Sequence, residues 1–400
     1  MKVNKWLKGG LAAVMALSLA ACSNSGTAAG GGDKGGSSKG GTIKIGGSGP
    51  LTGDAAVYGT AVKNAAEIAI EEVNKKGGLQ YELKMEDDKA DGEQAVTAYN
   101  NLVDWGMQVS LETVTSGAGQ AASPLYQQDH IFGLTPSASN PNVVYSDGVK
   151  MTGAYGNIFQ MCFSDPNQGI ASAEYLKKHT DLGSKVGIIW RNDDNYSTGL
   201  HDKFVAKAKE LGLDVVEDQT FTNGATDFSV QVKKVKDAGA DIVFMPIYYQ
   251  PASQILQEAK KEGYAPTFFG CDGMDGILTQ DGFDASLAEG LYMLTPFAAD
   301  STDEKTAAFV KTYKDKYGEV PNQFAADAYD CVYAIAQACD KAGVTGDMKA
   351  DEICDKLVEQ FTSMKFDGVT GSDVTWSESG EVSKDPRAIV IKGGAYVSAE

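Results

Sequence analysis

From Thr42 onward, short apolar runs alternate with stretches in which apolar residues recur at helical spacing. The run Thr42–Gly47 predicts a strand, and Gly59–Lys76 predicts a helix that stops at the following pair of glycines. The alternation continues with strands at Tyr81–Asp87, Val109–Thr113, Ile131–Thr135 and Ile158–Phe163, and with helices at Glu93–Trp105 and Gln120–Gln128.

A second series of the same kind follows. Its predicted helices are Gln168–His179, Gly199–Leu211, Phe228–Ala238 and Ala252–Glu262, and its predicted strands are Lys185–Trp190, Asp214–Phe221, Ile242–Ile247 and Thr267–Gly270. Nearly continuous apolar strands that alternate with helices are typical of parallel sheets covered on both faces. The pattern therefore predicts the α/β fold class, with two doubly wound, Rossmann-like lobes. Beyond them, Asp303–Phe361 is almost wholly helical in pattern, and Val374–Val397 predicts strands around a turn at Ser377–Gly380.

The first residues differ from the rest of the chain. Three lysines precede the apolar run Leu11–Leu17, and small residues follow it up to Cys22, which is typical of a secretory signal peptide over residues 1–21. A cysteine placed there resembles the lipobox of bacterial lipoproteins, which implies cleavage before Cys22 and a lipid on its sulfur. Residues 22–41 are rich in Gly and Ser and predict a flexible linker. We therefore expect an extracytoplasmic protein that is lipid-anchored to the cell membrane.

Composition narrows the possible partners. Removing residues 1–21 takes away three lysines and no acid, so the formal net charge moves from −19 to −22. Such an acidic surface repels nucleic acid and anionic headgroups, so we expect no nucleic-acid partner and membrane contact only through the lipid. The length that remains favours two lobes.

Signatures of catalysis and metal binding are scarce. The three histidines, His130, His179 and His201, have no zinc-ligand spacing, and no phosphate-binding loop of the GxxxxGK[ST] type occurs. We therefore expect no enzyme activity, no metal and no cofactor. The cysteines after Cys22 are interpreted mainly as small buried hydrophobes, with a Cys339–Cys354 disulfide left open; they are Cys162, Cys271, Cys331, Cys339 and Cys354.

Polar residues follow several predicted strands. Ser116 comes after Val109–Thr113 and just before a helix, where it is expected to be the N-cap and where free N–H groups could hold a carboxylate. A hydroxyl-rich cluster that includes Ser139 follows the next strand. Because the carboxyl ends of parallel strands line the ligand crevice, both serines could form one pocket. In the second series, Tyr196, Tyr248 and Asp272 follow strands; ordinary capping or turn roles for them remain open.

The sequence around these residues resembles the leucine/isoleucine/valine-binding family of type I periplasmic binding proteins, the receptors of branched-chain amino-acid ABC importers. The resemblance covers essentially all of residues 42–400. The matching segments are IKIGGSGPLTGDAAVYG (Ile43–Gly59), AIEEVNKKGGL (Ala69–Leu79), EDDKADGEQAV (Glu86–Val96), QAASPLYQQD (Gln120–Asp129), TPSASNP (Thr135–Pro141), NQGIASAEYLKKH (Asn167–His179), AADAYDCVYA (Ala325–Ala334) and FDGVTG (Phe366–Gly371).

The resemblance implies roles for individual residues. It assigns the ligand carboxylate to Ser116 and Ser139, and the ammonium group to the backbone carbonyl of Ser137, to Tyr248 and to Asp272. Aromatic walls fall on Tyr58, Tyr196 and Phe324. The sequence departs from the family pattern where Asp272 replaces a glutamate, where Ser139 replaces a threonine, and where Ala90 and Thr115 stand in place of a disulfide.

The resemblance also implies the architecture and the function. We expect two lobes joined by a multi-crossing hinge, the first made of residues 42–164 plus 297–373 and the second of 165–296 plus 374–400. The expected function is capture of apolar, branched-chain L-amino acids in an interlobe cleft, and delivery to an ABC transporter permease by a monomer. The alternatives are a receptor or sensor of the same fold for another amino acid, an amide or an aromatic acid, and an extracellular hydrolase.

Overall fold

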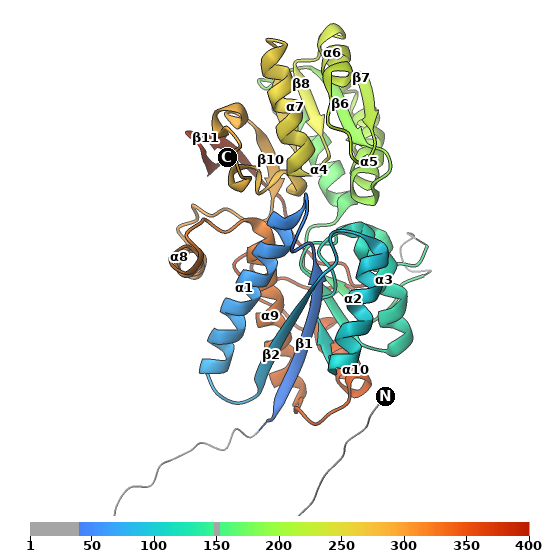
Figure 1. Cartoon of the computed structure of the whole chain (residues 1–400), viewed down its shortest axis with the longest axis vertical. Helices are drawn as coiled ribbons and strands as arrows, with labels where there is room; N and C mark the ends of the chain where they lie inside the picture. The colour runs from blue at the N-terminus through green and yellow to red at the C-terminus, as the bar shows by residue number, and fades with distance from the viewer. Residues whose placement is uncertain (1–39, 148–152, 400) are drawn as a thin grey trace, which may run out of the picture. The chain divides into compact units, whose positions relative to one another are not determined.

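The computed structural model describes residues 40–147 and 153–399. The predicted signal peptide, Cys22 and nearly all of the predicted linker lie outside the described residues. Two sheets are present, and helices cover both faces of each (Figure 1). The predicted fold class, two α/β lobes with parallel sheets, is confirmed.

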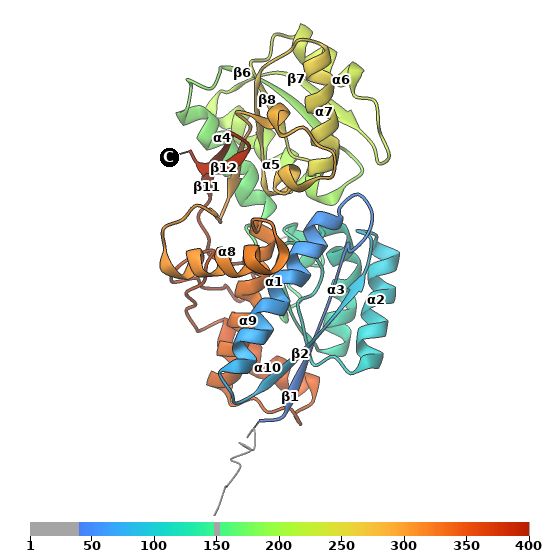
Figure 2. The ribbon, with the colours of Figure 1, turned by 60° about the vertical axis from the view of Figure 1, so that its left-hand side comes forward.

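The first sheet has the strand order β2-β1-β3-β4-β5, and all neighbouring strands in it are parallel. Helices α1 and α9 pack on each other against one face, and α2 and α3 pack together against the other (Figures 1 and 2). The strands are β1 (Thr42–Gly49), β2 (Gln80–Asp87), β3 (Val109–Ser110), β4 (Phe132–Thr135) and β5 (Ile158–Gln160). The helices are α1 (Ala56–Lys75), α2 (Gly92–Trp105), α3 (Ser116–Asp129), α8 (Glu304–Tyr317), α9 (Gln323–Ala342) and α10 (Ala350–Phe361).

The second sheet has the order β12-β11-β10-β9-β8-β6-β7. It is parallel from β7 to β10, but β11 and β12 are antiparallel to their neighbours, so the sheet is mixed at one edge. The strands are β6 (Lys185–Arg191), β7 (Asp214–Phe221), β8 (Ile242–Met245), β9 (Thr267–Gly270), β10 (Tyr292–Thr295), β11 (Arg387–Lys392) and β12 (Ala395–Ser398).

The alternation of side chains on β8 explains why helices cover both faces of this sheet. Ile242 and Phe244 pack with helices α4 and α5, whereas Val243 and Met245 pack with α6 and α7 on the opposite face. The helices are α4 (Asp165–Lys178), α5 (Asn195–Leu211), α6 (Ser229–Asp237) and α7 (Tyr249–Lys261), and the short 3-10 helices are η1 (Pro141–Val143), η2 (Asp272–Met274), η3 (Ile277–Thr279) and η4 (Ala285–Ala288).

The prediction of strands throughout Val374–Val397 was wrong for its first half. Strands begin only at Arg387, and the residues before them form isolated bridges. This segment instead follows β5: Gly380 accepts a hydrogen bond from the backbone N–H of Gln160 at 2.9 Å, and the indole of Trp376 donates to the Gln160 carbonyl at 2.8 Å. Gly380 has φ of +85°, and a Cβ there would lie 2.1 Å from the carbonyl oxygen of Ile158. A side chain at this position would therefore block the contact.

Other predictions about the chain hold. The helical pattern of Asp303–Phe361 is confirmed as α8, α9 and α10. The cysteines from Cys162 to Cys354 are all buried and free, so the open question of a Cys339–Cys354 disulfide is answered: the bridge is not formed. Over residues 40–147 and 153–399, none of the helices combines the length and the apolar character that a bilayer crossing requires.

Candidate functional site

The residues that the sequence predicted as ligand-binding surround one small space, the inner pocket, of about 240 Å³ including the part that is open to solvent. Most of its lining residues follow the carboxyl ends of strands in both sheets, as expected for an open α/β fold, and Tyr58 and Phe324 come from the first turns of α1 and α9. They are Tyr58, Val114, Thr115, Ser116, Ser137, Ser139, Tyr196, Tyr248, Asp272, Gly273 and Phe324. All of the predicted ligand contacts are therefore brought together, although they are spread over most of the chain.

The first wall is formed by the N-terminus of α3. Here the N-cap is Thr115, not Ser116, which is the first helical residue; the predicted capping role of Ser116 was wrong. The Ser116 hydroxyl instead accepts a hydrogen bond from the backbone N–H of Asn140 at 3.2 Å and keeps its own proton free. The Thr115 side chain is 5% exposed, and its Oγ1 has no hydrogen-bond partner among the described residues. The wall thus presents hydroxyl donors beside free helix N–H groups.

The loop after β4 adds Ser137 and Ser139. The Thr135 hydroxyl accepts from the backbone N–H groups of Ser137 at 3.3 Å and Ala138 at 2.9 Å, which fixes the turn. The carbonyl of Ser139 accepts from the N–H of Asp165 at 3.0 Å, at the start of α4. This loop therefore links the first sheet to the first helix of the second lobe.

The opposite wall contains Asp272, which is 4% exposed. The hydroxyl of Tyr196 donates to its Oδ1 at 2.6 Å, and Nε2 of Gln168 donates to its Oδ2 at 2.8 Å. Burial raises the pKa of Asp272 to about 6, although both hydrogen bonds lower it. Both oxygens are thus fixed before any ligand arrives, and the carboxylate lacks a cationic partner among the residues that line the pocket.

Aromatic rings fill the space between the two walls. Tyr196 stacks on Tyr248 with ring centroids 5.1 Å apart, and Tyr58 meets Tyr248 edge-on at 5.4 Å and Phe324 at 4.6 Å. Tyr58 also connects the lobes through its hydroxyl, which donates to the carbonyl of Gly273 and accepts from the N–H of Tyr249 at 3.2 Å. The pocket therefore has aromatic rings between polar groups at its two ends.

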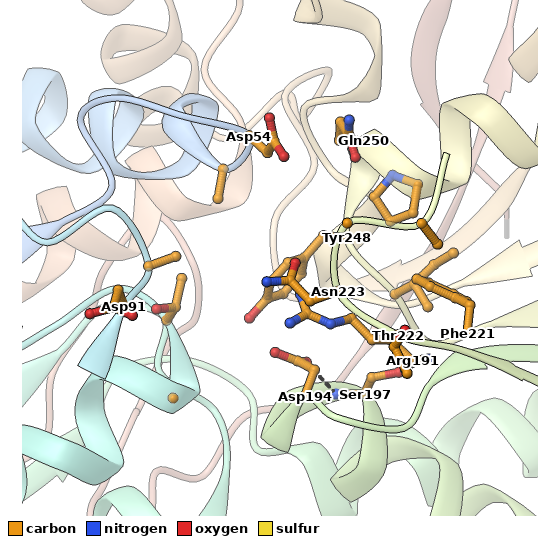
Figure 3. A pocket seen from close by; sticks show the side chains of 18 of the residues that line it. Asp54, Asp91, Arg191, Asp194, Ser197, Phe221, Thr222, Asn223, Tyr248 and Gln250 are labelled. Atoms are coloured by element: carbon orange, nitrogen blue, oxygen red, sulfur yellow. Dashed lines mark hydrogen bonds between the residues drawn. The ribbon is translucent and has the colours of Figure 1, made fainter. Parts of the chain in front are cut away.

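A larger space, the mouth chamber, adjoins the inner pocket. It measures about 1250 Å³ including the part that is open to solvent, and it shares Thr115 and Tyr248 with the inner pocket. Figure 3 shows Asp54 and Asp91 on one side, and Arg191, Asp194, Asn223 and Gln250 on the other. In contrast to the inner pocket, the mouth chamber is rich in charged side chains.

Comparison with known proteins identifies the family. A family model described as "Periplasmic binding protein" matches residues 42–395. A Leu/Ile/Val-binding protein homolog 1 from Brucella suis is 30% identical over 302 residues, which is 74% of this chain and 77% of the relative. The chain belongs to the Leu/Ile/Val-binding family of type I periplasmic binding proteins.

Two further relatives agree with this assignment. The leucine-, isoleucine-, valine-, threonine- and alanine-binding protein of Pseudomonas aeruginosa is 29% identical over 345 residues, covering 85% of this chain and 87% of the relative. The crystal structure of the branched-chain amino acid transporter substrate binding protein LivJ from Streptococcus pneumoniae, in complex with isoleucine, has a TM-score of 0.78. It shares 29% identity, covering 89% of this chain and 97% of that chain.

Members of this family bind and do not catalyse, so the chain is an extracytoplasmic binding protein of the branched-chain amino-acid ABC transporter type and not an enzyme. The arrangement of the histidines agrees with that. His130 contacts Asp355, His179 stacks on Tyr175, and none of the three lines the inner pocket. Among the described residues that line the inner pocket there is neither a histidine nor a lysine beside Ser116 or Ser139. Nor do the described residues contain a cluster of three His, Cys, Asp or Glu side chains suited to a metal.

Sequence reasoning missed several polar residues of the site. Gln168 and Asp165 lie on α4 and so read as ordinary helix residues, yet Gln168 holds Asp272 and Asp165 is fully buried beside Ser139. Burial raises the pKa of Asp165 well above its usual range. The Thr115 hydroxyl and the Arg191 guanidinium were also missed. Only the position of Arg191 at the end of a predicted strand could have indicated it.

Proposed function

We propose that this protein captures apolar L-α-amino acids, namely leucine, isoleucine and valine, in the inner pocket and delivers them to an ABC transporter permease. The convergence of the predicted contacts on one cavity, with an acid on one wall and hydroxyls on the other, is the observation that carries the proposal. The names of the Pseudomonas relative and of the isoleucine complex support the same ligand class.

The two ends of the pocket suit the two charges of an amino acid. Asp272 would bind the ammonium group together with Tyr248 and the Ser137 carbonyl. Ser116, Ser139 and the N-terminus of α3 would bind the carboxylate, because free N–H groups and the helix dipole favour an anion there. The rings of Tyr58, Tyr196 and Phe324 would surround the apolar side chain.

Contacts to both lobes explain how binding would be communicated. A ligand held by Asp272 of one lobe and by Ser116 of the other stabilises the closed form, in which Tyr58 already connects the lobes. The hinge proposed for this movement joins residues 42–164 plus 297–373 to residues 165–296 plus the C-terminal strands. The predicted boundary at residue 374 was too early, because residues 374–384 lie along β5 and α9 of the first lobe and the strands of the second sheet begin at Arg387. The closed form would dock on the permease.

Calorimetric titration of the purified protein with amino acids tests the ligand class. L-leucine, isoleucine and valine should bind more tightly than polar or acidic amino acids. The des-amino analogue of leucine, 4-methylpentanoate, should bind at least about tenfold more weakly, because it cannot pair with a buried carboxylate. Equal affinity for leucine and 4-methylpentanoate, or no binding of any apolar amino acid, would contradict the proposal.

We also propose that Cys22 carries the lipid that anchors the protein to the cell membrane, as the lipobox-like N-terminus suggests. The Cys22→Ala protein should then appear in the soluble fraction after detergent-free fractionation, whereas the wild-type protein should sediment with membranes. A Cys22→Ala protein that still sediments would show that the anchor lies elsewhere.

A further inference from the structure

The charges around the inner pocket are unbalanced. Asp272 and Asp165 are both buried next to it, and no lysine, arginine or histidine lines it within the described residues. A zwitterionic ligand brings an ammonium group, which Asp272 can neutralise, but it also brings a carboxylate. Within the described lining of the inner pocket, only hydroxyl groups and helix N–H groups are available to that carboxylate, so a cation nearby would add a stronger, charge-assisted contact.

Arg191 is the cation in the best position. It ends β6 and lines the mouth chamber, which meets the inner pocket at Thr115 and Tyr248. Burial raises the pKa of Tyr248 and of Asp194, and the nearby positive charge of Arg191 partly opposes that rise. In Figure 3 the Arg191 side chain projects into the mouth chamber near these two residues.

The guanidinium still has donors available. Within the described residues, its one hydrogen bond runs from Nε to Oδ1 of Asp193 at 2.7 Å, so both terminal nitrogens can donate to a ligand. A guanidinium is suited to this task because its planar fork matches the two oxygens of a carboxylate.

A second, independent feature lies on the facing lobe. Thr115 lines both spaces, its side chain is almost fully buried, and its hydroxyl has no partner among the described residues. A buried hydroxyl without a hydrogen-bond partner destabilises the protein. A ligand oxygen that accepts a hydrogen bond from the Thr115 hydroxyl would remove this cost. Gly117, in the first turn of α3, lines the same chamber.

We propose that Arg191 and the Thr115 hydroxyl, in addition to Ser116 and Ser139, bind the α-carboxylate of the ligand from opposite lobes, at the junction of the inner pocket and the mouth chamber. The inference rests on the proposed function and deepens it. It makes Arg191 a specificity-determining residue that selects carboxylic acids over the amides and esters of the same amino acids. It also means that the carboxylate, and not only the ammonium group, bridges the two lobes.

The test is titration of five purified proteins, the wild type, three variants and one control variant, with L-leucine and with L-leucinamide, which lacks the charged carboxylate. Arg191→Gln should weaken leucine binding by about tenfold or more while changing leucinamide binding less than about twofold. Arg191→Lys, which keeps the charge without the fork, should retain part of the affinity. Thr115→Val, which removes one hydroxyl at nearly constant shape, should weaken leucine binding several-fold.

Asp193→Asn is the matched control for a purely structural effect. Asp193 pairs with Arg191 and also accepts hydrogen bonds from the N–H of Asn223 in the neighbouring loop, so it supports that loop without lining either space. Removing its negative charge should leave leucine affinity unchanged or make it tighter, because the guanidinium is then less neutralised.

The outcomes separate the inference from the proposed function. If the wild-type protein binds neither leucine nor another apolar amino acid, the proposed function fails. If the wild-type protein binds leucine but Arg191→Gln changes its affinity less than twofold, the role of Arg191 is wrong and the proposed function stands. Arg191 would likewise have only a structural role in the loop if Arg191→Gln and Asp193→Asn lost equal affinity for leucine. The same conclusion would follow if Arg191→Gln lost equal affinity for leucine and leucinamide.

Discussion

Replacing Asp272 by asparagine should weaken the binding of L-leucine by at least about tenfold. The carboxylate is 4% exposed, and no other acid lines the inner pocket within the described residues. Removing one partner of a buried, hydrogen-bonded charge pair costs roughly 2–5 kcal/mol, or about 30- to several thousand-fold in affinity. Asparagine keeps the size and one acceptor oxygen, so the loss should lie toward the lower end of that range.

The same substitution should not destabilise the protein without ligand. Because burial raises the pKa of Asp272 to about 6, keeping its carboxylate ionised at neutral pH destabilises the folded state relative to the unfolded chain. Removing that charge offsets the weakening of the hydrogen bonds from Tyr196 and Gln168. Thermal melts without ligand should therefore give an equal or slightly higher Tm for the variant.

The pH dependence gives a second measurement. An ammonium group binds the ionised carboxylate, so leucine affinity of the wild type should fall as pH drops through about 6, and this part of the profile should be missing in Asp272→Asn. Asp91→Asn is a suitable control, because Asp91 is an acid of the mouth chamber and asparagine replaces aspartate well at its N-cap position. Its affinity should stay within about twofold. Unchanged affinity in Asp272→Asn would leave Asp272 as a turn residue only.

Much of the fold was predictable because buried strands and helices have regular patterns of apolar residues in the sequence. β8 shows this directly: all four of its residues are buried, alternately toward helices on opposite faces, and the result is an uninterrupted apolar run. The positions of Ser116, Ser139 and Asp272 were predictable for a related reason. Each follows a strand, and the carboxyl ends of parallel strands converge on the same crevice.

The parts that could not be predicted depend on contacts between distant segments. Thr115, not Ser116, is the N-cap of α3, and the Ser116 hydroxyl accepts a hydrogen bond from the N–H of Asn140 in the next loop. Gln168 holds Asp272 across 104 positions of sequence, and no local pattern distinguishes it from a solvent-facing helix residue. Residues 374–384 have a strand-like pattern, but they lie along β5 and α9 and do not enter a sheet.

The last of these segments contains Lys384, whose ammonium group is buried against α9. Replacing Lys384 by methionine should destabilise the protein by about 3–5 kcal/mol. The ammonium group of Lys384 donates to Oδ1 of Asp327 at 2.5 Å and to Oγ1 of Thr370 at 2.6 Å, and the side chains of Lys384 and Asp327 are 1% and 2% exposed. Breaking a buried pair by removing one partner leaves an uncompensated charge, which costs much more than losing a surface ion pair.

A second buried acid increases the cost. Asp330 lies one turn along α9 from Asp327 and accepts three hydrogen bonds from the FDGVTG loop, two of them from backbone N–H groups. That loop approaches so closely that a Cβ on Gly368 would lie 2.1 Å from Oδ2 of Asp330. The loop cannot move away to let water reach the carboxylates without losing these bonds. Lys384 is therefore the one cation for two buried acids within the contacts of the described chain.

Urea unfolding followed by tryptophan fluorescence measures the loss. Lys365→Met is the matched control, because Lys365 pairs with Asp373 at 3.0 Å but the two side chains are 68% and 74% exposed, so its stability should change by less than about 1 kcal/mol. Adding Asp327→Asn to Lys384→Met should restore part of the stability, since the unpaired carboxylate is then gone.

The pH dependence of the loss separates charge from packing. Burial raises the pKa of Asp327 to about 7 even with Lys384 present, and removing the ammonium group raises it further. A carboxyl whose pKa is higher in the folded state destabilises that state increasingly as pH rises, so the effect of Lys384→Met should be larger at pH 8 than at pH 6. A loss of the same size at both pH values would mean that Lys384 acts through its packed methylene chain. A loss no greater than that of Lys365→Met would mean that the buried charge cluster contributes little to holding the segment against α9.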